Sequence, residues 1–159
     1  MIQTIYIERQ VANHPRTQKI LARFPAAQQI GCDRYTEIFN PKNQNFRLQK
    51  QQPALIIAHK FGKRVLSAPE GYGGGGQHNY YFSHMLNCIY DCRYCFLQGM
   101  YRSAHYVLFI NYDDFFTSMD RTLANHPSED VWFFSGYDCD SLALDPVTGF
   151  AGHLLTFLE

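Results

Sequence analysis

Three of the five cysteines of this chain lie within eight residues, in the segment CIYDCRYC at positions 88–95. The spacing C-x3-C-x2-C allows the thiolates of Cys88, Cys92 and Cys95 to bind one inorganic centre. A cubane iron–sulfur cluster has four irons, so three cysteines leave one iron without a protein thiolate. Such an iron is open to a substrate, as the free coordination position of a catalytic zinc is. We therefore expect a loop at which the chemistry takes place, held by the rest of the fold.

The length and the charge of the chain narrow the class of protein. A chain of 159 residues is long enough for one domain with a core, and its formal net charge of zero provides no overall basic field for nucleic acid. No apolar run approaches the ~20 residues of a membrane helix, and no signal peptide is apparent at the N-terminus. The odd number of cysteines and their clustering favour metal binding in a reducing cytoplasm over a disulfide framework.

Residues 1–70 have the pattern of a small N-terminal α/β unit. Residues 2–7 alternate as in a strand, residues 17–24 have helical spacing before Pro25, and a weaker strand is predicted around residues 30–38. These three elements predict a β-α-β unit. Residues 40–53 contain four Gln and two Pro and are predicted to form a linker or an exposed loop.

Residues 71–159 have the alternating pattern of an α/β fold with parallel strands. Five glycines at positions 71–76 are interpreted as a mobile connection or, alternatively, as a loop over a ligand. After them the predicted order is strand, cysteine loop, strand, helix, strand, loop, helix. The predicted strands are residues 54–58, 79–85, 105–110 and 131–135, and the predicted helices are residues 96–100, 111–123 and 148–159. Ligands in such folds bind at the carboxyl ends of strands. We therefore expect the cysteine loop and the loop that begins at Gly136 to face one site.

Two other kinds of site remain open for the cysteine cluster. A zinc site normally needs four ligands, and His84, His105 or Cys139 is available as the fourth. Zinc loops usually pair cysteines as C-x2-C twice, which this chain does not. An iron–sulfur cluster with a fourth protein ligand, used only for electron transfer, is the other alternative. We interpret Cys32 as a small buried residue, and His59, His78 and His126 as surface or loop residues.

The C-x3-C-x2-C spacing resembles the signature of radical S-adenosylmethionine enzymes. In that superfamily the open iron of a [4Fe-4S] cluster chelates S-adenosylmethionine, and an electron from the cluster cleaves it to a radical that abstracts a hydrogen atom. The segments NCIYDCRYCFLQ (87–98), NYDD (111–114) and DCDSLALDP (138–146) are more closely similar to spore photoproduct lyases. Those enzymes reverse a thymine dimer in DNA by radical chemistry. The similarity is clear after Pro69 and covers about the first half of a typical family member.

The resemblance implies roles for particular residues. Cys88, Cys92 and Cys95 would bind the cluster, and Tyr94 matches a tyrosine of the family's hydrogen-transfer relay. The loop after the strand at Trp132 matches the region that meets the amino group of S-adenosylmethionine. The candidates in that loop are Ser135, Gly136, Asp138 and Asp140.

Two departures from the family pattern concern the hydrogen relay. Phe96 stands where the repair enzymes carry a second relay tyrosine, and it has no O–H to donate. Tyr137 stands where the family has its hydrogen-donating cysteine. Cys139 lies two residues further on, and because alternate residues of an extended segment share a face, Cys139 can take that role.

The resulting prediction is the start of a partial, incomplete (β/α) barrel of the radical S-adenosylmethionine type over residues 71–159, behind the unit at 1–70. The expected partners are DNA or a nucleotide-like substrate and a reductant such as a flavodoxin or ferredoxin, with no membrane. The alternatives are a non-enzymatic zinc or iron–sulfur module and an inactive truncated fragment, whose sheet edges would invite aggregation.

Overall fold

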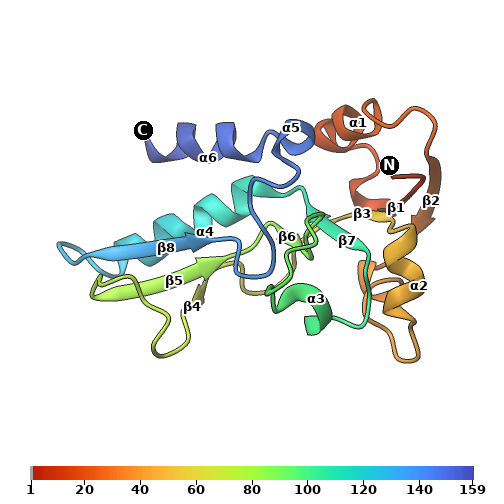
Figure 1. Ribbon diagram of the computed structural model, residues 1–159. Coiled ribbons are helices and arrows are strands. Elements are labelled where there is room, and N and C mark those ends of the chain that lie inside the picture. The colour runs from red at the N-terminus through yellow and green to blue at the C-terminus, as the bar shows by residue number, and fades with distance from the viewer. Residues whose placement is uncertain (1) are drawn as a thin grey trace.

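The computed structural model describes residues 2–159 and contains two sheets with helices packed against them (Figure 1). The strands are β1 (Thr4–Glu8), β2 (Gln28–Cys32), β3 (Leu55–Ala58), β4 (Leu66–Ser67), β5 (His78–Phe82), β6 (Met85–Leu86), β7 (Tyr106–Phe109) and β8 (Val131–Ser135). The helices are α1 (Pro15–Leu21), α2 (Phe46–Gln51), α3 (Leu97–Met100), α4 (Tyr112–Ala124), α5 (Asp145–Thr148) and α6 (Phe150–Leu158). Two short 3-10 turns, η1 (Arg9–Val11) and η2 (Tyr35–Glu37), complete the element order. No helix in the described part of the chain is long and apolar enough to cross a membrane.

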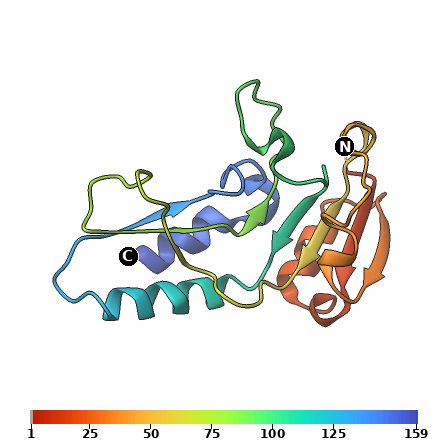
Figure 2. The same ribbon diagram turned by 90° about the horizontal axis from the view of Figure 1, so that it is seen from below.

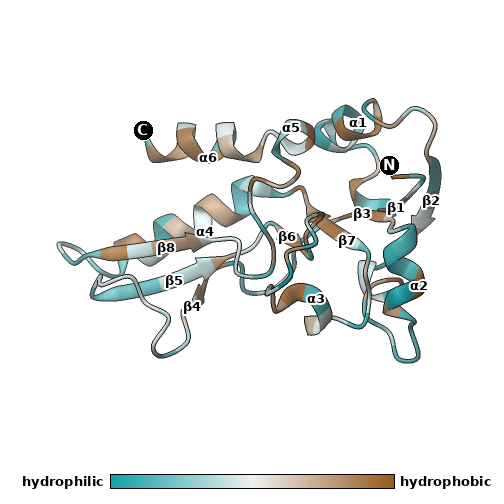
Figure 3. Cartoon of the chain, in the orientation of Figure 1, coloured by the Kyte–Doolittle hydropathy of each residue, from teal (hydrophilic) through white to brown (hydrophobic). Residues whose placement is uncertain are grey.

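The larger sheet has the strand order β2-β1-β3-β7-β6 and is parallel except for β6. Its two central strands, β3 (LIIA) and β7 (YVLF), are buried at every residue and form the brown centre of Figure 3. Continuous apolar runs of this kind are typical of parallel strands that are covered on both faces. This sheet therefore forms the rigid core of the molecule.

The smaller sheet has the strand order β4-β5-β8, with β5 and β8 parallel. Helices α4 and α6 run beside it in both views (Figures 1 and 2). Phe82 of β5, Phe115 and Met119 of α4 and Phe150 at the start of α6 belong to one buried cluster, which joins the helices to the sheet. β5 leads into the segment that carries the cysteines, and β8 ends at Ser135, directly before Gly136, so this sheet positions both loops.

The α/β class with parallel strands is confirmed, and neither sheet closes into a barrel. The β-α-β order at the N-terminus is also confirmed, with β1 and β2 parallel. Two local predictions are wrong. Residues 40–53 contain helix α2, whose N-terminus is capped by the Asn45 side chain accepting from the Leu48 N–H at 3.1 Å. The predicted strand at 30–38 is shorter and ends at Cys32, because Tyr35–Glu37 turns away as η2.

The two parts predicted from the sequence share both sheets. β3 pairs with β7, and β4 pairs with β5, so pairings cross position 70 in each sheet. The division into an N-terminal unit at residues 1–70 and the first part of a core at residues 71–159 stays a prediction, and strand pairing joins the two parts.

Candidate functional site

A cavity of about 260 Å³ lies between the cysteine loop and the loop that follows β8. The cysteine loop connects β6 to β7 and projects beyond the strands, as the green segment at the top of Figure 2 shows. The second loop leaves the carboxyl end of β8. The cavity is lined by Cys88, Tyr90, Cys92, Cys95, Phe96, Leu97, Gly136, Tyr137, Cys139 and Asp140. The two loops that the sequence places at strand ends therefore face one space.

Asn87 fixes the start of the cysteine loop. It is buried and has a left-handed backbone, with φ of 63°, which Asn tolerates better than most residues. Its side-chain amide donates to the carbonyl oxygens of Ser103 at 2.7 Å and His105 at 2.8 Å. Its backbone N–H donates to the Asp138 carbonyl oxygen at 2.9 Å. One residue thus ties both ends of the cysteine loop to each other and to the loop after β8.

Helix α2 holds the middle of the cysteine loop from outside. Lys50 Nζ lies 3.2 Å from a carboxylate oxygen of Asp91 and donates to Gln98 Oε1 at 3.0 Å. Gln98 Nε2 in turn donates to the Tyr90 carbonyl oxygen at 3.3 Å. The sequence gives no signal for this role of Lys50, because the helix that carries it was expected to be a loop.

The donor set of the loop fits a polynuclear iron–sulfur centre. All three cysteines are free; Cys88 and Cys95 are partly buried and Cys92 is exposed. The Tyr90 N–H donates to Cys88 Sγ at 3.4 Å, the kind of hydrogen bond that tunes cluster sulfur ligands. Within residues 2–159, only His78, His126 and Glu129 hold three ligand atoms within 4.8 Å of one another. At least one pair of the three sulfurs is therefore more than 4.8 Å apart, wider than the ~3.8 Å that Zn–S bonds of 2.3 Å imply in a tetrahedral site.

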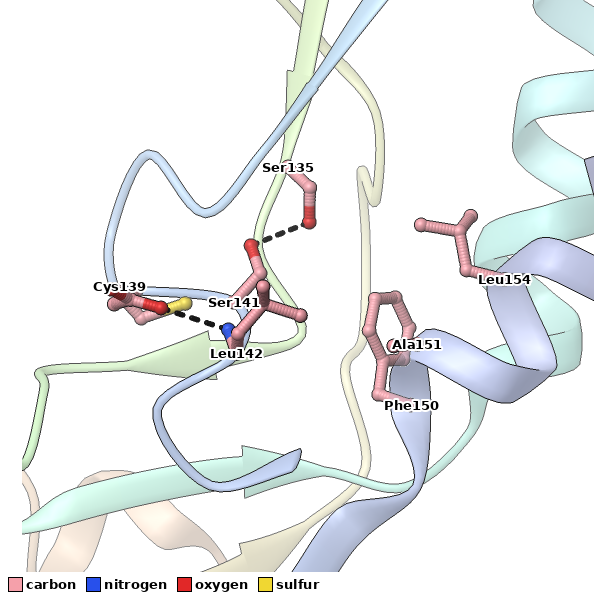
Figure 4. A pocket seen from close by; sticks show the side chains of 8 residues that line it. Ser135, Cys139, Ser141, Leu142, Phe150, Ala151 and Leu154 are labelled. Carbon is pink, nitrogen blue, oxygen red and sulfur yellow. Dashed lines mark hydrogen bonds between the residues drawn. The ribbon is translucent and has the colours of Figure 1, made fainter. Parts of the chain in front are cut away.

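Gly136 shapes the second loop. Its φ of 87° favours glycine, and a Cβ there would collide with Ser141 Oγ and lie 2.8 Å from the Cys139 carbonyl oxygen. Ser135 Oγ and Ser141 Oγ are 2.6 Å apart, and the Leu142 N–H donates to Asp140 Oδ1 at 2.9 Å (Figure 4). The loop is thus a tight, internally bonded turn that presents backbone groups to the cavity.

Tyr137 and Cys139 both line the cavity, whereas Asp138 between them faces away from it. Burial raises the pKa of the Cys139 thiol to about 12, so this residue is an S–H group at neutral pH. The Asp138 carboxylate accepts from Tyr101 Oη at 2.9 Å and lines a separate cavity of about 370 Å³ together with Lys60. Burial, the Asp138 charge and this hydrogen bond raise the pKa of Tyr101.

The remaining predicted residues lie at or outside the edge of the cavity. Tyr94 is 95% exposed and does not line it. Ser135 lines a neighbouring cavity of about 510 Å³, shown in Figure 4, which shares Cys139 and Asp140 with the first. Cys139 and Asp140 therefore form a wall between two spaces. Tyr90 and Leu97 also line the cysteine cavity, although the sequence analysis did not predict this. Their positions next to the cysteines in the sequence could have indicated that they line it.

Of the candidates for a fourth zinc ligand, only Cys139 faces the cysteine cavity. His84 is fully buried, and its ring stacks on Phe150 with centroids 3.7 Å apart. His105 Nδ1 accepts from the Ala54 N–H at 3.0 Å. Cys32 is 6% exposed, as expected for a small buried residue, and is remote from the cavity lining.

Comparison with known proteins finds similarity in structure alone. No protein-family model matches the chain, and no curated protein sequence matches it significantly. A cysteine-to-serine variant of spore photoproduct lyase superposes with a TM-score of 0.79 at 16% sequence identity. A variant of the same enzyme with bound AdoMet and dinucleoside spore photoproduct gives 0.80 at 16%, and a complex with dinucleoside spore photoproduct gives 0.76 at 15%.

Each of these matches covers 99% of this chain and 46% of the solved chain. The chain thus spans about half the length of the structures that it matches. The resemblance read from the cysteine segment is confirmed at the level of the fold, with the incomplete barrel that it implied. The chain has the fold of one part of spore photoproduct lyase.

Proposed function

We propose that the chain is an iron–sulfur protein of the radical S-adenosylmethionine type, related to spore photoproduct lyase. The observation that carries the proposal is the cavity in which Cys88, Cys92 and Cys95 face the Gly136 loop. A solved structure with bound AdoMet has the same fold at low sequence identity, which supports this choice of cofactor.

The three cysteine thiolates are the proposed ligands of a [4Fe-4S] cluster. When bound, such a cluster supplies the electron that cleaves S-adenosylmethionine. The turn at Gly136 offers backbone groups at the cavity wall, and the Asp140 carboxylate can accept from the ligand's amino group. Ser135 supports this turn through Ser141, and Asp138 supports it through its carbonyl bond to Asn87.

Cys139 is the proposed hydrogen donor, and Tyr137 is the second candidate. Both line the cavity, and the raised pKa of Cys139 keeps its hydrogen on sulfur at neutral pH. Tyr94, at 95% exposure, would act only if the substrate itself covers it. Phe96 lines the cavity without a hydroxyl group, so the relay step of the family's second tyrosine is missing at this position.

The proposed substrate is DNA or a nucleotide-like molecule with a pyrimidine lesion, and the proposed setting is the cytoplasm, with a flavodoxin or ferredoxin as reductant. Three of the matched structures contain dinucleoside spore photoproduct, which supports the substrate class. The chain spans about half the length of those proteins. The DNA-repair activity of the whole enzyme is therefore proposed for this chain and not inferred from the fold alone.

The test is anaerobic reconstitution with iron and sulfide, followed by dithionite and S-adenosylmethionine. We expect about four irons per chain, broad absorption near 400 nm and release of 5′-deoxyadenosine. Cys92→Ala is expected to abolish all three, and Cys32→Ala, a buried cysteine outside the cavity, is the matched control. A preparation with one zinc and no sulfide would favour a non-enzymatic zinc module instead. Cluster absorption that survives in Cys92→Ala would contradict the proposal.

A further inference from the structure

We propose a second metal site, formed by His78, His126 and Glu129, that binds a divalent ion of the zinc class. It lies at the amino end of β5 and in the connection between α4 and β8, at the opposite end of the small sheet from the cysteine loop (Figure 1). Imidazole nitrogen and carboxylate oxygen together suit zinc-like ions and not Mg²⁺ or Ca²⁺, which prefer oxygen ligands.

The three ligand atoms already converge. One atom from each residue lies within 4.8 Å of the other two. His78 Nε2 is 2.7 Å from Glu129 Oε2, and His126 Nδ1 is 3.7 Å from Glu129 Oε1. Bonds of 2.0–2.1 Å to a tetrahedral ion place the ligand atoms about 3.4 Å apart. The rings of His78 and His126 stack with centroids 3.7 Å apart and 27° between their planes, so they must turn apart for both nitrogens to point at one ion.

A tyrosine orients one of the histidines. Tyr80 Oη lies 2.8 Å from His126 Nε2. If Nε2 carries the proton and donates to the phenol oxygen, the lone pair of Nδ1 faces Glu129. Metal-binding histidines usually make this type of outer hydrogen bond through the nitrogen that does not bind the metal. A plain ion pair between His78 and Glu129 would not need His126 oriented in this way.

The backbone fixes the three positions relative to each other. The His78 N–H donates to the Asp130 carbonyl oxygen at 3.0 Å, and His78 is paired with Val131 in the β5–β8 register. The Glu129 N–H donates to the His126 carbonyl oxygen at 3.3 Å. An ion bound here would hold the start of β5 against the turn after α4. These two segments are about fifty residues apart in the sequence.

The site is open to water on one side. The side chains of His78 and His126 are 29% and 20% exposed, and that of Glu129 is 43% exposed. Three protein ligands and an accessible fourth position leave room for a water molecule. We infer a structural clip for β5 and β8 with one exchangeable ligand.

The test must exclude zinc bound by the cysteine loop. Isothermal titration of Zn²⁺ is therefore made on the full chain with Cys88, Cys92 and Cys95 replaced by Ala. We expect one equivalent of Zn²⁺ to bind, and we expect His126→Gln and Glu129→Gln in that background to weaken binding at least tenfold. His153→Gln, which changes an exposed histidine of α6, is the control and should bind as the parent does.

A second measurement separates a binding defect from a folding defect. Zn²⁺ should raise the melting temperature of the parent that lacks Cys88, Cys92 and Cys95 and of His153→Gln, and leave that of Glu129→Gln unchanged. Because Glu129 is an exposed side chain, this variant should fold normally. Tyr80→Phe should weaken binding and change the His126 tautomer seen in imidazole ¹⁵N chemical shifts. If the triple-cysteine variant binds no stoichiometric zinc, or if Glu129→Gln binds zinc with equal affinity, the three residues form only an ion pair and the proposal is overturned.

Discussion

Cys139 separates two cavities, and its surroundings determine its protonation. The side chain is 4% exposed, and burial, the largest cause, raises its pKa to about 12. Removal of water disfavours the thiolate, and the nearby carboxylate of Asp138 acts in the same direction. A residue that donates a hydrogen atom must hold that hydrogen on sulfur. The burial of Cys139 is therefore what the proposed donor role requires.

Cys139 should resist alkylation far more than Cys92. With a pKa of about 12, only about one Cys139 in ten thousand is a thiolate at pH 8, and the thiolate is the reactive form. Iodoacetamide labelling of the folded chain, followed by peptide mass mapping, should modify the exposed Cys92 at least tenfold faster. Cys32, also buried and with its pKa raised to about 11, is the matched slow control. Equal labelling rates for Cys92 and Cys139 would contradict the described burial.

The position of the loop after β8 beside the cysteines was predictable from the sequence, but the direction of single side chains was not. Tyr137 and Cys139 share the cavity, as expected, but they do so on a turn and not on an extended segment, since the Cys139 N–H donates to the Gly136 carbonyl oxygen at 3.3 Å. Asp138 was grouped with them as a ligand-binding residue, yet its carboxylate faces Tyr101, 37 positions away in the chain. Tyr94 sits between two cysteines in the sequence and still points to solvent. Such contacts depend on distant segments that no local spacing encodes.

Helix α2 is the element that the sequence analysis did not predict. Its residues FRLQKQ are mostly polar, as its teal colour in Figure 3 shows, and none of them is buried. Apolar periodicity is the main sequence signal for a helix, and α2 has little. The remaining sequence signal for this helix is Asn45 at its N-cap position, and Asn is equally common in turns. The buried strands β3 and β7 were predictable because their apolar runs allow few other structures.

Replacing Lys50 by Gln should loosen the cysteine loop. The change removes the ion pair with Asp91, in which the Lys50 side chain is 26% and the Asp91 side chain 77% exposed. Pairs of this kind contribute about 1 kcal/mol or less, so the open population should rise by at most about fivefold. Limited trypsin digestion should cut after Arg93 up to about fivefold faster. Lys19→Gln on the exposed face of α1 is the control, and an unchanged rate at Arg93 in Lys50→Gln would refute the link.

The glycine-rich connection before β5 lies against the single tryptophan of the chain. A Cβ at Gly76 would be 2.7 Å from Trp132 Nε1, and one at Gly74 would be 2.7 Å from Trp132 Cε3. Asn79 ties the same connection to β5, since its Nδ2 donates to the Gly76 carbonyl oxygen at 2.8 Å. Gly74 and Gly76 thus allow the backbone of this connection to approach the indole ring of Trp132 closely.

Gly76→Ala should push the indole ring toward water. We expect a red shift of the tryptophan emission and a loss of about 1 kcal/mol of stability, as is typical when a methyl group is forced into a packed contact. Emission spectra and thermal unfolding measure both effects. Gly31→Ala, where side-chain atoms of Arg9 would be 4.0 Å from the new Cβ, should leave the emission unchanged. A variant Gly76→Ala with the parent spectrum would show that the connection does not rest on Trp132.

At the scale of the whole molecule, a buried histidine makes stability depend on pH. His84 is fully buried, and burial lowers its pKa to about 3. The unfolded chain protonates this residue below about pH 6.5, while the native chain does not protonate it until about pH 3. The free energy of unfolding therefore falls as the pH is lowered from 6.5 toward 3, by up to about 1.4 kcal/mol per pH unit.

His84→Phe should reduce this loss of stability in acid. The ring of His84 stacks on Phe150 with an angle of 8° between planes, so phenylalanine preserves the stack and cannot be protonated. Between pH 7.5 and pH 5 the parent should lose about 2 kcal/mol more than the variant, measured by urea unfolding. His153→Gln should lose as much as the parent. An equal loss in His84→Phe and the parent would show that His84 is not the group responsible.

The position of β7 between β3 and β6 has a consequence during synthesis. β3 pairs with a strand made 51 positions later, since Leu55 pairs with Tyr106. At about 5–20 residues per second, the ribosome needs roughly 3–10 s to produce that partner. During this interval β1, β2 and β3 have an open edge on β3, whose four residues all become buried in the finished fold. The nascent chain therefore presents an apolar strand that chaperones can recognise, and Cys88, Cys92 and Cys95 are synthesised before the strand that covers it.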